Sequence, residues 1–348
     1  MPVAYVTEPH AVIRRSGRTI IVERDGTRLA EWELTRLQSI VLCGNVHLTS
    51  PAAKLLLRHG IETAYLGRSG ELLGQLTPAK PANIELRMRQ YAIHQNAEHR
   101  LIHASETVQQ KIRSQQVVLE RYAANYTEEN LKKVRSQLKD SLIQVSKAVS
   151  LAQLRGIEGF AARCYWSGFR SQVRGDLKFG GRSIRPPRDE VNALLSLGYS
   201  FLCNELSALL DAIGFDPWLG FYHDRRNHRP ALALDLMEPL RHDLVDRMVL
   251  RMVNRRQVQA ADFSGSAGNG FRLSRDGWKT FVHGWETMMQ TITGPETNRQ
   301  NQRQLLQNVA EEFRRRLMGS VVDSTITEAD TPEGINESMP PLEEQDDE

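Results

Sequence analysis

The pattern of hydrophobic and polar residues changes once along the chain, near residue 80. Before that point, short runs rich in Val, Ile, Thr and Leu alternate with turn-forming residues, which is typical of β-strands. The runs cover Val3–Val6, Thr19–Val22, Arg28–Leu34, Gln38–Leu42, Ile61–Leu66 and Glu71–Gln75. Asp25-Gly26, between two of them, is the strongest hairpin signal, and Pro51–His59 is typical of one short helix. We therefore predict a small β-sandwich-like domain over residues 1–77.

After residue 83 the hydrophobic period becomes helical. Residues 84–122 contain no Gly or Pro and carry apolar side chains at helical intervals. Further helices are predicted over residues 128–154, 156–166, 189–213, 231–257 and 303–318. Pro186-Pro187 requires a loop, because tandem prolines cannot continue a helix, and Gly265–Gly270 indicates a loop between two short strands. We expect an α+β protein, with a linker over residues 78–94 and a larger all-α domain over residues 95–322.

The distribution of charge adds a possible partner to this picture. The formal net charge of +3 hides ten acidic residues, with no Lys or Arg, between Asp323 and Glu348. This segment predicts a disordered acidic tail over residues 323–348. Residues 1–322 then hold 45 basic and 32 acidic residues, a net charge of +13. Such a basic body is typical of proteins that bind a polyanion, and nucleic acid is the first partner to consider.

Several classes of protein are disfavoured by the sequence. The longest apolar stretch, Val191–Phe215, is interrupted by Asn and Glu, which indicates a buried helix and not a membrane span. The N-terminus has no apolar signal core, and Cys43, Cys164 and Cys203 are too widely spaced for a disulfide scaffold or a zinc knuckle. These features predict a cytoplasmic protein. The chain lacks GxxxxGK[ST] and HExxH, so a nucleotide-hydrolysing motor is not supported.

Two acidic residues stand beside an apolar helix face. Asp235 and Glu238 are three positions apart, so their side chains project from one side of the predicted helix. Close carboxylates repel each other unless a cation or a proton lies between them, which favours a metal site. The alternative is a solvated acidic stripe balanced by Arg241 and Arg247. His223, in a loop shortly before the pair, is either a further ligand or a structural histidine.

Glu158 is a charged residue among small and apolar neighbours, in the segment Arg155-Gly-Ile-Glu-Gly. Gly156 and Gly159 each cost a helix about 1 kcal/mol relative to Ala. Small residues around an acid allow a ligand or another backbone to approach it. The pattern is equally compatible with a functional acid and with a core glutamate paired to Arg155 or Arg163.

The segment from residue 163 to residue 188 is strongly basic and contains only one acid, Asp176. Aromatic side chains are interleaved with the basic ones, and Gly and Pro make part of it a loop. The candidate DNA-binding residues are Arg163, Arg170, Arg174, Lys178, Arg182, Arg185 and Arg188. A solvated loop is the alternative, but such one-sided charge next to candidate acids is typical of contacts to phosphate backbones.

Taken together, these motifs resemble one known family. They are Arg155-Gly-x-Glu158-Gly, Arg185-Pro-Pro-Arg-Asp-x-Val-Asn192, Gly220-x-x-His223 and Leu232-Ala-Leu-Asp235-Leu-Met-Glu238. The combination is similar to the CRISPR-associated adaptation integrase, the first of the two near-universal adaptation proteins, and the Arg-Pro-Pro loop resembles the type I-C branch. The resemblance extends over about residues 1–318. The acidic tail has no counterpart in the family, and it serves solubility or competes with DNA.

The resemblance implies a fold, a cofactor and partners. It implies a homodimer formed through the N-terminal domain and a catalytic helical domain that holds Mg²⁺ or Mn²⁺ through Glu158, His223 and Glu238. Asp235 matches a further acidic position near the metal. The resemblance also implies double-stranded DNA (prespacer and CRISPR repeat), a heterohexamer with the second adaptation protein, and association with an iron–sulfur adaptation nuclease. No membrane is involved.

The predicted activity is a metal-dependent DNA endonuclease and integrase that joins prespacer 3′-hydroxyl ends to the repeat of a CRISPR array by transesterification. A divalent cation polarises the phosphoryl oxygen and makes the attacking oxygen more reactive, and an imidazole ligand favours Mn²⁺ over Mg²⁺. The alternatives are a stand-alone nuclease on branched or broken DNA and a non-catalytic DNA-binding scaffold. His242, one turn beyond Glu238, is either a hydrogen-bond donor behind the site or an exposed residue.

Overall fold

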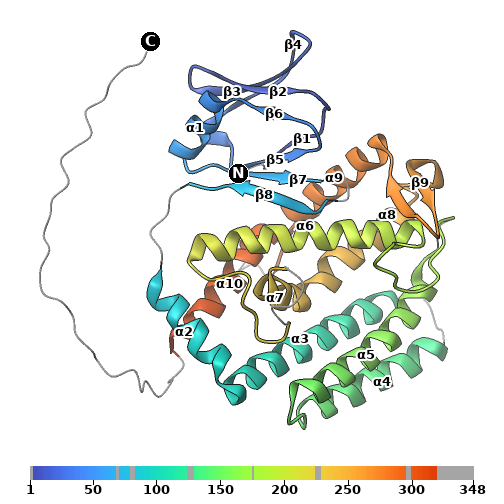
Figure 1. Cartoon of the computed structure of the whole chain (residues 1–348). Helices are drawn as coiled ribbons and strands as arrows, with labels where there is room; N and C mark the ends of the chain where they lie inside the picture. Colours follow the sequence, from blue (N-terminus) through green and yellow to red (C-terminus); the bar gives the residue numbers. More distant parts are fainter. Residues whose placement is uncertain are drawn as a thin grey trace, which may run out of the picture.

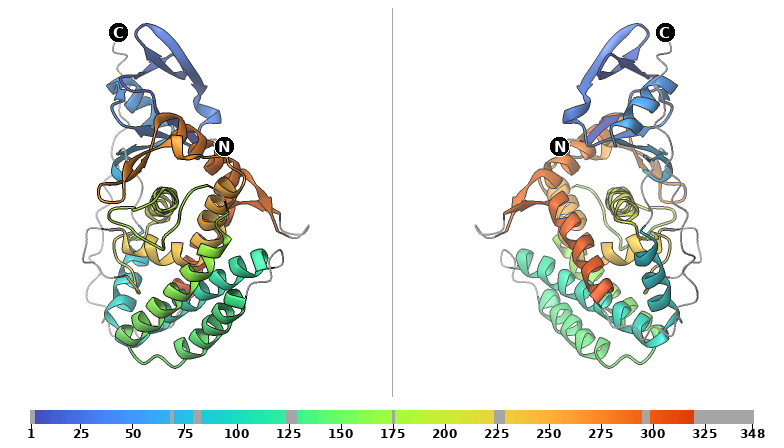
Figure 2. Two further views of the ribbon diagram at one scale, coloured as in Figure 1. Left: turned by 90° about the vertical axis from the view of Figure 1, so that its right-hand side faces the viewer. Right: turned by 90° about the vertical axis from the view of Figure 1, so that its left-hand side faces the viewer.

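The computed structural model confirms the α+β fold. It describes residues 3–67, 70–78, 83–123, 129–174, 176–223, 229–294 and 299–319. A strand-rich N-terminal domain lies at one end of a larger helical domain, and the rotated views keep this arrangement (Figures 1 and 2). The predicted acidic tail over residues 323–348 lies outside the described residues.

The N-terminal domain consists of two four-stranded sheets and one helix, α1 (Ser50–Arg58). One sheet has the order β1-β5-β7-β8 and the other β4-β3-β2-β6. The strands are β1 (Val3–Val6), β2 (Val12–Ser16), β3 (Thr19–Arg24), β4 (Thr27–Glu33), β5 (Ser39–Cys43), β6 (His47–Leu48), β7 (Glu62–Leu66) and β8 (Leu72–Leu76). Ile13, Ile20, Ile40 and Leu56 from both sheets and α1 share one core, as a sandwich requires.

The hairpin predicted at Asp25-Gly26 joins β3 to β4, and both residues have positive φ, 50° and 76°. Such angles suit Asp and Gly in a tight turn. Strands β2 and β6 were not predicted. In β2 only Ile13 is buried and its last three residues are exposed, so the sequence lacks the alternation by which a strand is recognised.

The linker predicted over residues 78–94 is wrong in its second half. Helix α2 (Ile84–Gln95) begins immediately after Asn83, whose side chain accepts a hydrogen bond from the Leu86 amide. Gln90 of α2 is fully buried and donates to two backbone carbonyls, those of Asp216 and Leu219. The helical domain therefore starts at α2 and not at residue 95.

The helical domain contains the helices α3 (Ala97–Ala123), α4 (Glu129–Val145), α5 (Leu151–Gln172), α6 (Glu190–Ile213), α7 (Ala231–Arg241), α8 (Arg247–Asn254), α9 (Arg275–Gln290) and α10 (Gln302–Gly319). Asp189 caps α6 as predicted for the start of that helix, accepting from the Asn192 amide. By length and composition α6 is the one described helix that could cross a membrane. Its side chains Leu194, Leu202 and Leu206 are fully buried in the protein core, which confirms the predicted buried helix.

Several helix boundaries differ from the prediction. The run over 84–122 is broken at Asn96, which has an extended backbone and whose side chain accepts from the amides of Glu98 and His99. The run over 128–154 divides before Ser150, which caps α5. Helix α9 was not predicted at all. The domain is mostly helical, and it also contains two short hairpins. The hairpin of β9 (Phe263–Ser266) with β10 (Gly270–Leu273) confirms the two short strands predicted around Gly265–Gly270, and β11 (Ile292–Thr293) with β12 (Gln300–Asn301) forms the other.

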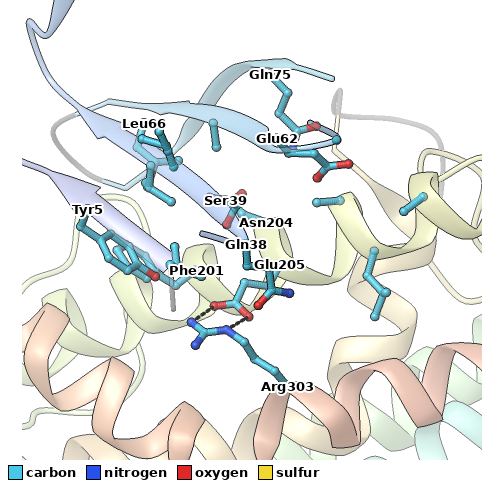
Figure 3. Close-up of a pocket in the computed structure, with 18 residues that line it drawn as sticks. Tyr5, Gln38, Ser39, Glu62, Leu66, Gln75, Phe201, Asn204, Glu205 and Arg303 are labelled. Carbon is cyan, nitrogen blue, oxygen red and sulfur yellow. Dashed lines mark hydrogen bonds and ion pairs between the residues drawn. The ribbon is translucent and has the colours of Figure 1, made fainter. Parts of the chain in front are cut away.

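The two domains meet where the sheet β1-β5-β7-β8 lies over α6 (Figure 1). Tyr5 of β1 stacks on Phe201 of α6, with ring centroids 5.9 Å apart. Beside this pair, Arg303 of α10 contacts both Glu205 and Glu286, at 3.1 and 2.5 Å. A cavity of about 280 Å³ remains between the sheet and the helix (Figure 3). The interface thus combines apolar packing with a partly buried ion-pair cluster.

Candidate active site

The site is built around a short loop, Gly220–His223, that precedes α7. The carboxylate of Asp235, on α7, accepts hydrogen bonds from the amides of Phe221, Tyr222 and His223 at 2.6, 3.0 and 2.9 Å. Gly220 lies so close that a Cβ there would be 2.6 Å from Asp235 Oδ2. Glycine at this position therefore allows the loop to wrap around the carboxylate.

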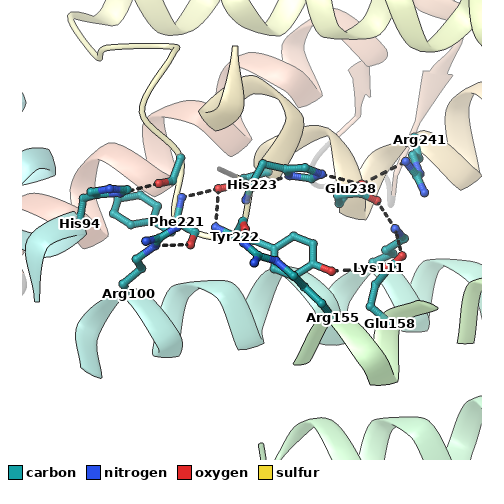
Figure 4. A network of polar contacts seen from close by, with 12 residues as sticks. His94, Arg100, Lys111, Arg155, Glu158, Phe221, Tyr222, His223, Glu238 and Arg241 are labelled. Carbon is teal, nitrogen blue, oxygen red and sulfur yellow. Dashed lines mark hydrogen bonds and ion pairs between the residues drawn. The ribbon is translucent and has the colours of Figure 1, made fainter. Parts of the chain in front are cut away.

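The carbonyl groups of the same loop are held by three helices. His94 Nδ1 of α2 contacts the Gly220 oxygen at 2.7 Å, Arg100 Nε of α3 donates to the Phe221 oxygen at 2.8 Å, and Arg155 Nη2 of α5 donates to the Tyr222 oxygen at 3.3 Å (Figure 4). Both the amide groups and the carbonyl groups of the loop are thus held by contacts with neighbouring helices. This fixation positions the side chain of His223.

The His223 ring has a defined tautomer. Nδ1 lies 2.7 Å from Asp235 Oδ1, and because an ionised carboxylate only accepts, Nδ1 carries the proton. Nε2 faces Glu238 Oε1 at 3.7 Å. A carboxylate behind a histidine is the usual arrangement when the other ring nitrogen binds a metal. Asp235, which is 2% exposed, thus orients His223 and has little capacity left for a ligand of its own.

Glu158 and Glu238 approach each other from α5 and α7, with one lysine between them. Lys111, on α3, contacts Glu158 Oε1, and its Nζ lies 2.8 Å from Glu238 Oε2 (Figure 4). The Lys111 side chain is 4% exposed, and the two glutamates are 18% and 3% exposed. The hydroxyl of Tyr222 donates to Glu158 Oε2 at 3.4 Å. The carboxylates predicted from the sequence therefore meet in the structure.

Glu238 is ionised despite its burial. Burial by itself would raise the pKa of Glu238, but the positive charges of Arg241 and Lys111 outweigh burial and lower the pKa to about 2. Arg241 Nη1 donates to Oε1 at 3.0 Å. The contact of Lys111 with Oε2 is close but poorly aligned, so Oε2 is a buried oxygen without a hydrogen bond. The cation that this buried oxygen faces in the described structure is the Lys111 ammonium.

Glu158, His223 and Glu238 are accordingly the side chains that could hold a divalent cation. Within the described part of the chain, no group of three His, Cys, Asp or Glu side chains is closed around a single point in the way a preformed metal site would be. The Lys111 ammonium accounts for the separation of these three, since it stands between the two carboxylates. The imidazole of His223 and the carboxylates of Glu158 and Glu238 fit a metal ligand set in their chemistry.

A second polar cluster is buried behind Glu238. Residues His242–Asp246 form one turn of π-helix between α7 and α8, a feature often found near functional sites. Asp246 accepts hydrogen bonds from Tyr165 and Tyr199, and it contacts His242 Nδ1 at 2.7 Å. His242 is fully buried, so the expectation of an exposed residue is wrong. Arg241 lies over the Tyr199 ring, so this cluster supports the arginine that contacts Glu238.

The basic segment divides into two kinds of residue. Six of its seven candidate DNA-binding side chains are exposed: Arg163, Arg170, Arg174, Lys178, Arg185 and Arg188. Arg182 instead points inward and donates to Asn192 and Ser196, with its guanidinium over the rings of Trp166 and Tyr199. Arg182 therefore makes its described contacts within the protein, whereas the other six side chains are exposed.

Sequence reasoning missed Lys111. A lysine in a long helix is ordinarily solvated, and no neighbouring residue marks it as different. The structure shows that Val108 and Gln115, three before and four after Lys111 on the same helix face, are both buried. The position therefore belonged to the buried face of α3. Its partners, on α5 and α7, could not be read from α3 alone.

The fold matches those of solved structures. The chain is similar to a solved casposase bound to an integration product, with a TM-score of 0.81 and 21% identity over 91% of this chain and 90% of that one; this likeness concerns the fold. It is also similar to a chain of a solved Cas6-RT-Cas1–Cas2 complex, with a TM-score of 0.78 and 28% identity over 91% of this chain and 35% of the other.

Sequence comparison identifies the family. Residues 4–287 match the family described as CRISPR associated protein Cas1, and the chain belongs to this family. It is 36% identical over 286 residues to a CRISPR-associated endonuclease Cas1 of Thermus thermophilus, covering 82% of this chain and 83% of that protein. It is 35% identical over 300 residues to a Cas4 exonuclease/Cas1 endonuclease fusion of Geobacter sulfurreducens, covering 84% of this chain and 54% of the fusion. The resemblance inferred from the motifs is thereby confirmed.

Proposed function

We propose that this chain is a metal-dependent DNA endonuclease and integrase, which joins the 3′-hydroxyl ends of prespacer DNA to the repeat of a CRISPR array. The observation that carries the proposal is the convergence of Glu158, His223 and Glu238 from α5, the loop before α7, and α7 itself. His223 Nε2 lies 3.7 Å from Glu238 Oε1, and Lys111 Nζ contacts Glu158 Oε1 and Glu238 Oε2. Membership of the Cas1 family supports the same activity.

The side chains divide the work at the site. Mg²⁺ or Mn²⁺ held by Glu158, His223 and Glu238 supplies charge stabilisation at the attacked phosphate and a more reactive nucleophilic oxygen. Asp235 orients the His223 ring so that Nε2 points toward Glu238, and the imidazole favours Mn²⁺. Arg241 keeps Glu238 ionised and oriented. Asp235 is therefore a positioning residue, whereas the other three bind the cofactor.

DNA binding is assigned to the basic body of the chain. Residues 1–322 carry a net charge of +13, and the six exposed basic residues between 163 and 188 begin on α5, the helix that carries Glu158. Contacts of this kind hold the phosphate backbone and carry little sequence information. The segment thus serves to hold double-stranded prespacer and repeat DNA across the site.

Family membership and two similar proteins support the proposed partners. We assign a homodimer formed through the N-terminal domain and a heterohexamer with the second adaptation protein; the solved Cas6-RT-Cas1–Cas2 complex supports the latter. Association with an iron–sulfur adaptation nuclease is supported by the relative in which a Cas4 exonuclease and a Cas1 endonuclease form one chain. The assembly acts in the cytoplasm of a prokaryote.

Strand transfer tests the proposal directly. A labelled prespacer is incubated with a plasmid carrying a repeat, the second adaptation protein and Mn²⁺, and wild type is compared with His223→Ala. His283→Ala is a matched control, because His283 is exposed on α9. Metal-dependent joined product from wild type and His283→Ala, but not from His223→Ala, supports the integrase. Equal product from all three would refute the assigned site.

The two alternatives give different products in the same assay. A stand-alone nuclease would cleave the DNA without joining it, and cleavage would be lost in His223→Ala. A scaffold would bind DNA and yield neither product. Asp235 and Glu238 are almost fully buried and Glu158 is largely so, next to a basic segment. Burying charged groups costs free energy, and a scaffold without catalytic activity would have no need of them.

A further inference from the structure

The Lys111 ammonium contacts two carboxylates, and all three groups are unusually buried for charged side chains. Lys111 and Glu238 are almost fully buried, and Glu158 is largely so. Each carboxylate disfavours the charge of the other unless a cation lies close to both. Lys111 Nζ is the group that meets this need in the described structure, because Arg241 contacts Glu238 but has no contact with Glu158.

The ammonium contacts both of the carboxylates that the proposed metal would use. It lies against Glu158 Oε1 and Glu238 Oε2, one oxygen from each of the two carboxylates assigned as ligands. The same oxygens cannot be shared fully by an ammonium and a divalent cation, since two cations at one position repel each other. Either the lysine moves away from at least one carboxylate or the metal does not bind there.

Lys111 is also better suited to move than Arg241. The Arg241 guanidinium donates to Glu238 Oε1 and stacks over Tyr199, so it is held in two ways. Lys111 ends in a point charge on a flexible four-carbon stem, without a ring contact among those described. The contact of Lys111 with Glu238 Oε2 does not have hydrogen-bond geometry, whereas Arg241 donates a hydrogen bond to Glu238 Oε1.

We infer that Lys111 is a resident counter-ion of the metal-free site. It holds Glu158 and Glu238 together before the metal binds, and it is displaced from at least one of them when the metal enters. Lys111 therefore stabilises the metal-free protein and lowers its affinity for the metal. It is a positioning residue, and this inference rests on the proposed metal site.

Direct binding of Mn²⁺ to the purified full-length protein, followed by electron paramagnetic resonance of free Mn²⁺, tests this role. Lys111→Met removes the charge and keeps the length of the side chain, and Lys111→Gln retains hydrogen bonding. We expect both variants to bind Mn²⁺ at least about tenfold more tightly than wild type, equivalent to about 1.4 kcal/mol. Their metal-free melting temperature is expected to fall, and its rise on addition of Mn²⁺ to exceed that of wild type.

Arg303→Gln is the matched control. Arg303 also lies between two carboxylates, Glu205 and Glu286, but at the domain interface. This variant is expected to lose stability and to keep the Mn²⁺ affinity of wild type. An unchanged or weaker Mn²⁺ affinity in the Lys111 variants would overturn the inference. Equal Mn²⁺ binding by wild type and His223→Ala would instead overturn the proposed metal site, so the two failures are distinct.

A second measurement needs no variant and covers the case in which the Lys111 variants do not fold. In a crystal structure of the Mn²⁺-loaded wild-type protein, Lys111 Nζ should lie beyond ion-pair distance of at least one of the two glutamates. An Nζ that still contacts both carboxylates with Mn²⁺ bound would overturn the displacement.

Discussion

Asp235 holds His223 twice, by the backbone amide at 2.9 Å and by the ring nitrogen Nδ1 at 2.7 Å, and both bonds end on the same oxygen. The orientation of the loop and the tautomer of the ring are therefore determined by one carboxylate. The other oxygen of Asp235 is occupied by the amides of Phe221 and Tyr222. Asp235 therefore acts on the site by orienting His223.

Replacing Asp235 by Asn is expected to reduce the rate of strand transfer by about 10- to 100-fold, as is typical for loss of the group behind a metal-binding histidine. In Asp235→Asn, the side-chain NH₂ would replace an oxygen that accepts hydrogen bonds. It would face either the loop amides or the His223 ring nitrogen, which are themselves donors, and would disturb the loop and the orientation of the ring. Asp276→Asn, at an exposed position on α9, is the control and should retain full activity. Unaltered activity of Asp235→Asn, with circular dichroism showing a folded protein, would contradict the positioning role.

Gly220 and Gly268 form a matched pair for substitution by Ala. A Cβ on Gly220 would lie 2.6 Å from Asp235 Oδ2 and 2.8 Å from the Ala231 oxygen, whereas a Cβ on Gly268 would have no atom within 4 Å. We expect Gly220→Ala to lower the melting temperature and to abolish strand transfer, because the loop must shift. Gly268→Ala should leave both unchanged. Thermal unfolding and the strand-transfer assay measure the contrast; equal behaviour of the two variants would rule out a close-packed loop.

Arg182 and Arg185 should respond differently to substitution by Ala. Arg182 donates to Asn192 and Ser196 inside the protein, while Arg185 is exposed. Arg182→Ala is therefore expected to destabilise the fold by about 1–3 kcal/mol, the cost of leaving buried groups unpaired. Arg185→Ala should preserve stability and weaken DNA binding. The slope of log affinity against log salt concentration should become smaller in magnitude by about one. Urea unfolding and DNA titrations at several salt concentrations separate the two effects.

Stability should fall as the pH falls below about 6.5, the unperturbed pKa of histidine. Burial lowers the pKa of His242, against the opposing effect of Asp246, and burial also lowers the pKa of His103. Below pH 6.5 the unfolded chain binds protons at these residues before the folded protein does, so protonation favours unfolding. Each histidine contributes up to about 1.4 kcal/mol per pH unit to the slope of the free energy of unfolding against pH. Urea unfolding between pH 8 and pH 5.5 measures the slope, which should be shallower in His242→Gln; the same slope in that variant would contradict the assignment.

Much of this protein could be predicted from local sequence. Six of the eight strands of the N-terminal domain, the Asp25-Gly26 hairpin and the Asp189 cap of α6 depend on short-range periodicity and turn chemistry, and these were identified. Strand β2 could not be identified in the same way, since most of its side chains are exposed. The candidate residues Glu158, His223, Asp235 and Glu238 were selected by residue type and spacing, and the structure brings all four together.

The sequence by itself thus determined the α+β class, the basic body and the acidic residues available for chemistry, because composition and periodicity are properties of the chain alone. Only the tertiary structure decided which partner each of these residues meets. Lys111 contacts a glutamate 47 positions away, and the guanidinium of Arg182 lies over an aromatic ring of another helix. A hydrophobic period indicates which face of a helix is buried, but the identity of the groups across that face depends on how the helices pack. Long-range packing therefore placed an ammonium between the two carboxylates.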